Sequence, residues 1–111
     1  MRQKLPNRRP SRIFTFSFKG HTFVANLGYY TNPTRLGEIF IRCGKSGYDA
    51  EIWMLETAVA VSFALQNGAT VEDMRSAMPR RANGEAEGPV GTLLDLLAGE
   101  DLKEAELELL R

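Results

Sequence analysis

Cysteine and histidine are almost absent from this chain of 111 residues, since Cys43 and His21 are the only residues of their kinds. One cysteine cannot close an intramolecular disulfide, and one cysteine with one histidine cannot form a structural zinc site. A catalytic thiol at Cys43 would also lack a base close in sequence. We therefore expect a cytoplasmic protein with no metal, no cofactor and no catalytic residue among its candidate sites.

Long hydrophobic runs are also missing. The most apolar stretch carries Glu51 and Glu56 at helical spacing, so neither a membrane-spanning helix nor the core of a secretory signal is predicted. A chain of 12.4 kDa with 43% apolar residues has enough material for one domain with one modest core. This size excludes a complete multi-domain enzyme.

Net charge is absent as well, because 14 basic side chains balance 14 acidic ones. The balance hides a split: residues 1–50 hold nine basic and two acidic groups, about +7, and residues 51–111 hold about −7. Such a chain can fold back on itself, pair with a copy or offer a basic face to an anion.

The first half of the chain has the pattern of an antiparallel sheet. Residues 1–12 combine five positive charges with two prolines and predict a flexible basic arm. Apolar side chains then alternate along residues 13–18 and 21–29, on either side of a tight turn at Lys19 and Gly20. Residues 38–42 predict a third strand, which completes a three-stranded meander.

The second half has helical periodicity. Residues 49–67 predict a long helix that is buried on more than one side, ending at Gly68. Its main apolar face is predicted to hold Ile52, Leu55, Val59, Phe63 and Gln66.

A short helix capped by Thr70 should follow and end near Ala77, and a loop should precede two further helical segments. Those segments, residues 90–97 and 101–110, are expected to be separated at Gly99. The predicted fold class is α+β: a small antiparallel three-stranded sheet packed against one long buried helix and several short helices. The expected division is an arm (1–12), an α+β domain (13–98) and an acidic amphipathic C-terminal helix (99–111).

A glycine-rich turn between the third strand and the long helix is the first candidate site. Backbone N–H groups and a lysine in such a turn can contact a phosphate. The turn lacks the first glycine of a P-loop, because Ile39 occupies that position. The alternative is a structural turn in which the glycines supply positive φ angles. The candidate residues are Gly44, Lys45, Ser46 and Gly47.

Arginines of the basic half are the second candidate site. Several charges on an arm can neutralise phosphates of a nucleic acid, with binding that weakens steeply as salt is added. The alternatives are a solubilising arm, or an arm that docks on the acidic C-terminal helix of the same or another molecule. The candidate nucleic-acid contacts are Arg8, Arg9, Arg12, Arg35 and Arg42.

Several motifs resemble the TSCPD domain family, over roughly residues 20–97. They are Gly28-Tyr29-Tyr30, the strand Gly37-Glu38-Ile39-Phe40-Ile41, the turn Gly44-Lys45-Ser46-Gly47, and the helix end Ala60-Val61-Ser62-Phe63-Ala64-Leu65-Gln66-Asn67-Gly68-Ala69. This domain occurs at the C-terminal end of adenosylcobalamin-dependent and related ribonucleotide reductases, and as small stand-alone proteins of bacteria and phages. The resemblance implies an α+β fold.

The segment that gives the family its name differs here. Gly91-Thr92-Leu93-Leu94-Asp95 keeps the acidic residue but lacks the family's cysteine and proline, so any metal or redox role of that cysteine is absent. Reductase catalysis resides in a ten-stranded barrel much larger than this chain. The resemblance therefore implies no ribonucleotide reductase activity for this chain alone.

Taken together, these features predict a non-catalytic accessory or interaction module that acts through protein partners. The alternative is a small nucleic-acid-binding or regulatory protein that uses the basic half. An enzyme acting at the glycine-rich turn is a third reading. Self-association, as a homodimer for example, is a separate expectation, because a helix apolar on more than one side beside three strands leaves surface uncovered.

Overall fold

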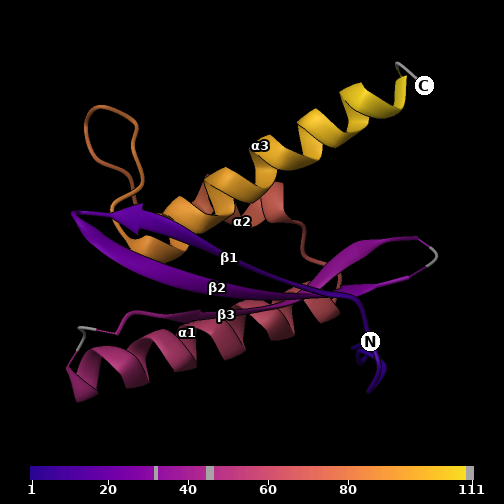
Figure 1. Cartoon of the computed structure of the whole chain (residues 1–111), viewed down its shortest axis with the longest axis horizontal. Coiled ribbons are helices and arrows are strands. Elements are labelled where there is room, and N and C mark those ends of the chain that lie inside the picture. Colours follow the sequence, from indigo (N-terminus) through magenta and orange to yellow (C-terminus); the bar gives the residue numbers. More distant parts are fainter. Residues whose placement is uncertain (32, 45–46, 110–111) are drawn as a thin grey trace. The chain divides into compact units, whose positions relative to one another are not determined.

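The chain folds into three strands followed by three helices (Figure 1). We describe a computed structural model, which covers residues 1–31, 33–44 and 47–109; the side chains of Tyr48 and of residues 100–109 are outside the description. The elements are β1 (Ser11–Phe18), β2 (His21–Tyr30), β3 (Arg35–Arg42), α1 (Tyr48–Gln66), α2 (Val71–Ala77) and α3 (Pro89–Leu109). The contacts define two compact units, residues 1–69 and 70–111. The predicted α+β class is confirmed.

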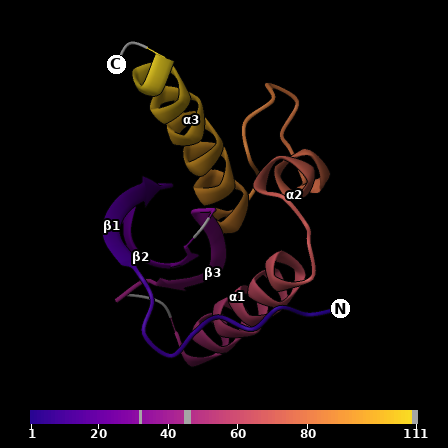
Figure 2. The same cartoon turned by 90° about the vertical axis from the view of Figure 1, so that its right-hand side faces the viewer.

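The sheet has the strand order β1-β2-β3, with both pairs antiparallel. Figure 2 shows the sheet curving strongly, with α1 beside β3. Phe18 pairs with His21, so the hairpin loop is Lys19 and Gly20, both with positive φ as a type I′ turn requires. Along β2 every second side chain is buried, among them Phe23 and Leu27, which confirms the predicted alternation.

Helix α1 lies against the free edge of β3 and supplies hydrogen-bond partners to it. The hydroxyl of Ser62 accepts a hydrogen bond from Ile39 N at 2.9 Å and donates one to Ile39 O at 3.1 Å. One turn later, Gln66 Nε2 donates to Gly37 O at 3.1 Å. Ser62 and Gln66 are both buried. They satisfy backbone groups that an edge strand would otherwise leave unpaired in a dry environment.

The burial of α1 differs from the prediction. The helix is buried along one face only, through Ala58, Val61 and Leu65 together with Ser62 and Gln66. Four large apolar side chains of the helix are instead exposed: Trp53, Leu55, Val59 and Phe63. The reason is that the helix docks on a strand edge, which needs small and polar side chains to reach the backbone, so the larger apolar residues point elsewhere.

The N-terminal segment crosses α1, as Figure 2 shows. Gln3 N donates to Gln66 O at 2.8 Å, and Arg2 Nε donates to Gln66 Oε1 at 2.8 Å. The hydroxyl of Tyr30 donates to Gln3 O. The predicted arm therefore makes specific contacts with α1 and β2, while its mobility in solution stays a prediction.

The second unit contains α2 and α3, which lie side by side. The Thr70 side chain accepts a hydrogen bond from Asp73 N at 3.0 Å, which confirms the predicted cap of α2. The predicted break at Gly99 is wrong, because α3 is one continuous helix of 21 residues. A single glycine inside a helix costs only about 1 kcal/mol relative to alanine, and Gly99 does not take a positive φ.

None of the described helices combines the length and the hydrophobicity needed to cross a bilayer.

Candidate functional site

The glycine-rich turn between β3 and α1 is only partly described. Lys45 and Ser46 lie outside the described residues, so the structure does not bear on their contact with a phosphate. Gly44 and Gly47 are exposed, and neither has a positive φ. The positive φ angles that the structural alternative expected are therefore absent at these two glycines. Gly47 caps α1 in an extended conformation, with a backbone bond from Glu51 N to Gly47 O at 3.0 Å.

Beside this turn, a pocket of about 590 Å³ opens between α1 and strands β2 and β3. Its charged side chains are Arg42 from β3 and Glu51 from α1, and Asn26 adds an amide from β2. The apolar lining consists of Phe40, Ile41, Ile52, Met54, Leu55 and Ala58. The pocket can therefore hold an apolar group with a polar end. Its nine lining residues include no serine, cysteine or histidine that could act as a nucleophile or a neutral base.

The edge of β3 also contributes backbone groups to this pocket. The N–H and C=O of Ile39 point away from β2, toward Ser62. Backbone groups alternate in direction along a strand, so the N–H and C=O of Ile41, two residues later, point toward the same edge. At that level α1 presents Leu55 and Ala58, whose side chains cannot hydrogen-bond. Ile41 thus offers one backbone donor and one backbone acceptor at the pocket.

An exposed apolar surface continues from this pocket along α1. We call it the α1 apolar face and define it as Ile52, Leu55, Val59 and Phe63. Leu55, Val59 and Phe63 are exposed to 49%, 54% and 51%, and their spacing of four residues places them in one row. Phe40 of β3, 37% exposed, lies at the pocket end of this row with Leu55. A contiguous row of large half-exposed apolar side chains is typical of a contact surface for another molecule.

The guanidinium of Arg2 covers the other end of the α1 apolar face. Its Cζ atom lies 4.9 Å from the centre of the Phe63 ring, a cation–π distance. The bond from Arg2 Nε to Gln66 Oε1 holds the guanidinium in this place. The face therefore runs from a pocket with mixed charge to a single positive charge.

Two of the candidate nucleic-acid contacts, Arg9 and Arg35, bind other groups of the fold. Arg9 forms a bidentate ion pair with Glu38, at 2.8 and 3.1 Å, and donates to Pro6 O. Arg35 donates to Leu65 O and to Gln3 Oε1 and stacks over the Tyr30 ring at 4.3 Å.

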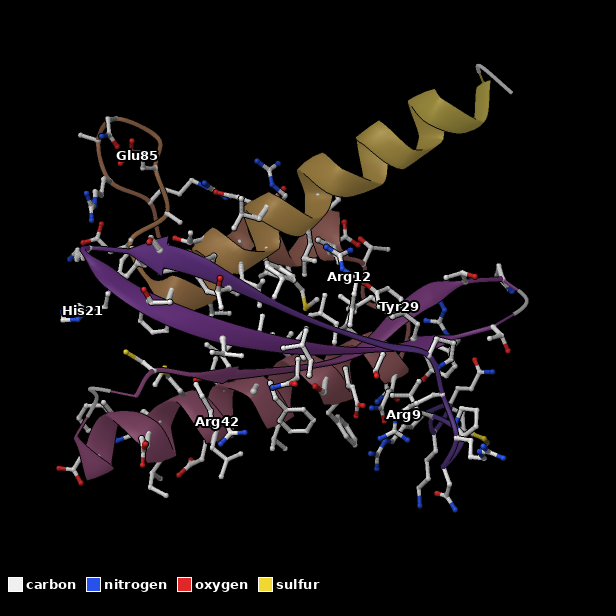
Figure 3. The ribbon with its side chains drawn as sticks, in the orientation of Figure 1. Arg9, Arg12, His21, Tyr29, Arg42 and Glu85 are labelled. Atoms are coloured by element: carbon white, nitrogen blue, oxygen red, sulfur yellow. The ribbon has the colours of Figure 1, made fainter. Side chains whose placement is uncertain are left out.

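Three candidate contacts remain. Arg12 stacks over the Phe14 ring at 5.1 Å, Arg8 is exposed, and Arg42 lines the pocket. Figure 3 shows Arg9 near the N-terminal segment and Arg42 beside α1. Arg9 and Arg35 thus act within the fold, and Arg42 is the candidate that the structure places at a pocket.

The second unit holds an ion-pair cluster centred on Asp95. Arg80 donates to both carboxylate oxygens of Asp95, at 2.9 and 2.8 Å, and Arg75 Nε donates to one of them at 3.0 Å. These hydrogen bonds, that from Arg80 above all, lower the pKa of Asp95, against the opposing effect of burial. The cluster raises the pKa of both arginines through their bonds to Asp95. Among the described residues its partners are the two arginines, an arrangement typical of a structural ion pair.

The arginines of this cluster also bind the backbone around them. Arg80 donates to Arg75 O at 2.8 Å and to Gly84 O at 3.1 Å, which ties the end of α2 to the loop before α3. Within the described residues, no group of three or more His, Cys, Asp or Glu side chains is placed to hold a metal ion.

Comparison with known proteins gives one relation. No protein-family model matches the chain, and no solved structure matches it. Among curated proteins, the vitamin B12-dependent ribonucleotide reductase of Agrobacterium fabrum (strain C58) is 36% identical over 72 residues. This chain is similar to one region of a ribonucleotide reductase. The match covers 65% of this chain and only 6% of the reductase, so the chain corresponds to a small part of that enzyme.

Sequence reasoning missed the role of two residues in the quoted motifs. Ser62 and Gln66 belong to the helix-end motif, where they bind the edge of β3. The available signal was their polar character within a run of apolar residues. Gly68, the last residue but one of the same motif, has φ +102° and ends the helix as predicted. The motif thus describes how α1 is attached to the sheet.

Proposed function

We propose that this protein is a non-catalytic accessory or interaction module, related to the TSCPD domain of ribonucleotide reductases, that acts through a protein partner. The observation that carries the proposal is the α1 apolar face, a row of half-exposed large side chains on a helix whose neighbouring face is anchored to the sheet. Similarity to one region of a vitamin B12-dependent ribonucleotide reductase supports a role connected with that class of enzyme.

The side chains of the pocket suit binding of a protein surface. The pocket combines an apolar lining with two charged side chains, Arg42 and Glu51, and with the backbone groups of Ile41. Such a lining can recognise an apolar side chain that lies beside a polar group. Among the described lining residues, Glu51 is the one acidic group, and no serine, cysteine or histidine lies beside it to form a nucleophile–base pair. We assign the partner contact to this pocket together with the α1 apolar face.

The nucleic-acid alternative receives less support. Arg9 and Arg35 hold the fold together through Glu38, Leu65 and Gln3, so their phosphate contacts would compete with internal bonds. A mobility-shift titration of the full chain against single- and double-stranded nucleic acid decides this alternative. Affinity that falls steeply with salt would favour it over the protein-partner proposal.

Site-specific photo-crosslinking in the cells that naturally make the protein tests the proposal. A photoreactive phenylalanine analogue replaces Val59 in the centre of the α1 apolar face, and in a matched control it replaces Ser76, an exposed residue of α2. We expect a discrete, reproducible protein adduct from position 59 and none from position 76. Absence of any adduct at position 59, with the chain at its natural abundance, would overturn the proposal.

A further inference from the structure

The α1 apolar face has opposite charges at its two ends. The acidic side chains of α1 lie in its first half, at Asp49, Glu51 and Glu56, and the helix contains no lysine or arginine. Arg42 of β3 lies at the same end, beside Glu51, so the described side chains there have a net negative charge. The opposite end carries the guanidinium of Arg2 over Phe63. A surface with an apolar centre, an acidic end and a basic end is complementary to itself only in the reversed direction.

We propose that the α1 apolar face is covered by the same face of a second copy of this chain, with the two α1 helices antiparallel. The two-fold axis passes beside Val59, so the two Val59 side chains meet each other. Leu55 of each copy then lies opposite Phe63 of the other. This inference specifies the partner in the proposed function and therefore rests on it.

The charges select the antiparallel direction. In an antiparallel pair, Arg2 over Phe63 of one copy comes level with Leu55 and Glu56 of the other. The contact occurs twice, because a two-fold axis generates both ends of the interface. A parallel pair would instead place Glu56 beside Glu56 and Arg2 beside Arg2, which is repulsive at both ends.

The dimensions and side chains suit this pairing. From Ile52 to Phe63 the row is about 16 Å long at 1.5 Å per residue, which gives about three turns of helix contact. Helices approach to about 8–10 Å between their axes when medium-sized apolar side chains interlock. The smallest member, Val59, lies at the centre of the row, and the larger Leu55 and Phe63 flank it, so the bulky side chains fill the space on either side of the axis.

Cysteine crosslinking of the full chain tests the register. Single substitutions Val59→Cys, Leu55→Cys and Phe63→Cys are oxidised mildly, alone and in mixtures. We expect Val59→Cys to form a covalent dimer with itself, because the two Cα atoms lie within disulfide range. Leu55→Cys should crosslink with Phe63→Cys in a mixture far more than either does alone.

Two controls accompany this test. Thr57→Cys places the thiol on an exposed position of the same helix, about 160° away from Val59, and should not crosslink. The unsubstituted chain, whose native Cys43 is buried, measures the background, and far-ultraviolet circular dichroism checks that each variant folds.

The results separate the two proposals. Self-crosslinking of Leu55→Cys and of Phe63→Cys, without the mixed product, would overturn the antiparallel pairing. If no variant crosslinks above Thr57→Cys while photo-crosslinking at position 59 captures a different protein, the second-copy proposal fails and the proposed function stands. If both experiments give nothing at position 59, both fail.

Discussion

Asp95 is held by two arginines, Arg80 and Arg75. With its carboxylate bonded to Arg80 and Arg75, its pKa is depressed in the folded protein. Folding therefore gains stability from this group at pH values above the pKa of an unfolded aspartate, about 3.9. That contribution is lost as the pH falls through the lower, folded pKa.

Asp95→Asn should lower the melting temperature by a few degrees at pH 7, because the substitution removes the negative charge between the two arginines. The difference between the wild type and the variant should shrink as the pH falls through the pKa of Asp95, since the wild-type carboxyl then becomes neutral. Thermal unfolding followed by circular dichroism from pH 7 down to about pH 2, well below the pKa of an unfolded aspartate, measures this. A difference that is the same at every pH would show that the charge of Asp95 contributes nothing.

A second prediction concerns the contribution of the Ser62 hydroxyl to stability. Ser62→Ala leaves the N–H and C=O of Ile39 without their partner at a fully buried strand position. We expect the free energy of unfolding to fall by about 1–3 kcal/mol. The matched control is Ser76→Ala, which removes an exposed hydroxyl that donates to Glu72 O and should change stability by less than about 0.5 kcal/mol. Equal urea midpoints for the two variants would contradict the role assigned to Ser62.

Among the elements, the strands were the most predictable from the sequence. Alternation of apolar and polar residues fixes which side chains of β2 are buried, and the dipeptide Lys19-Gly20 indicates the hairpin turn. Such patterns can be read from neighbouring residues alone, because side chains along a strand point alternately toward the core and away from it. The Thr70 cap of α2 could likewise be predicted from neighbouring residues.

The orientation of α1 could not be predicted in the same way. Apolar residues occur on nearly every side of this helix, so periodicity does not indicate which side is buried. The choice is made by the edge of β3, where Ser62 and Gln66 reach the backbone and the small Ala58 permits close approach. The pocket residues come from β2, β3 and α1, so only the tertiary fold brings them together.

Reversing the charges at the ends of the proposed helix pair tests its antiparallel direction, which apolar contacts alone do not determine. Arg2→Glu, or Glu56→Arg, should weaken the dimer about three- to tenfold, because each substitution puts like charges together at both ends of the interface. The double variant should recover most of the affinity. Sedimentation velocity over a concentration series measures the dissociation constants. Two independent losses that simply add in the double variant would contradict the pairing of Arg2 with Glu56.

For the whole molecule, the structure shows where charged residues of the basic and the acidic half form contacts. Part of the basic half is used within the fold, through Arg9 with Glu38 and Arg35 with Leu65, and Arg2 covers the end of an apolar face. In the acidic half, Asp95 binds Arg75 and Arg80 in its own unit. The surplus charges of α1 and Arg2 remain for contact with another molecule, which we propose to be a second copy.

Sedimentation equilibrium of the purified full chain tests this central claim most directly. The wild type should approach twice the 12.4 kDa of one chain at high micromolar concentration. Val59→Asp, which buries a carboxylate at the two-fold axis, should stay at the mass of one chain and keep the wild-type circular dichroism spectrum. Thr57→Asp, the control on the opposite side of α1, should associate like the wild type. A wild-type protein that stays at the mass of one chain at every concentration would contradict the claim.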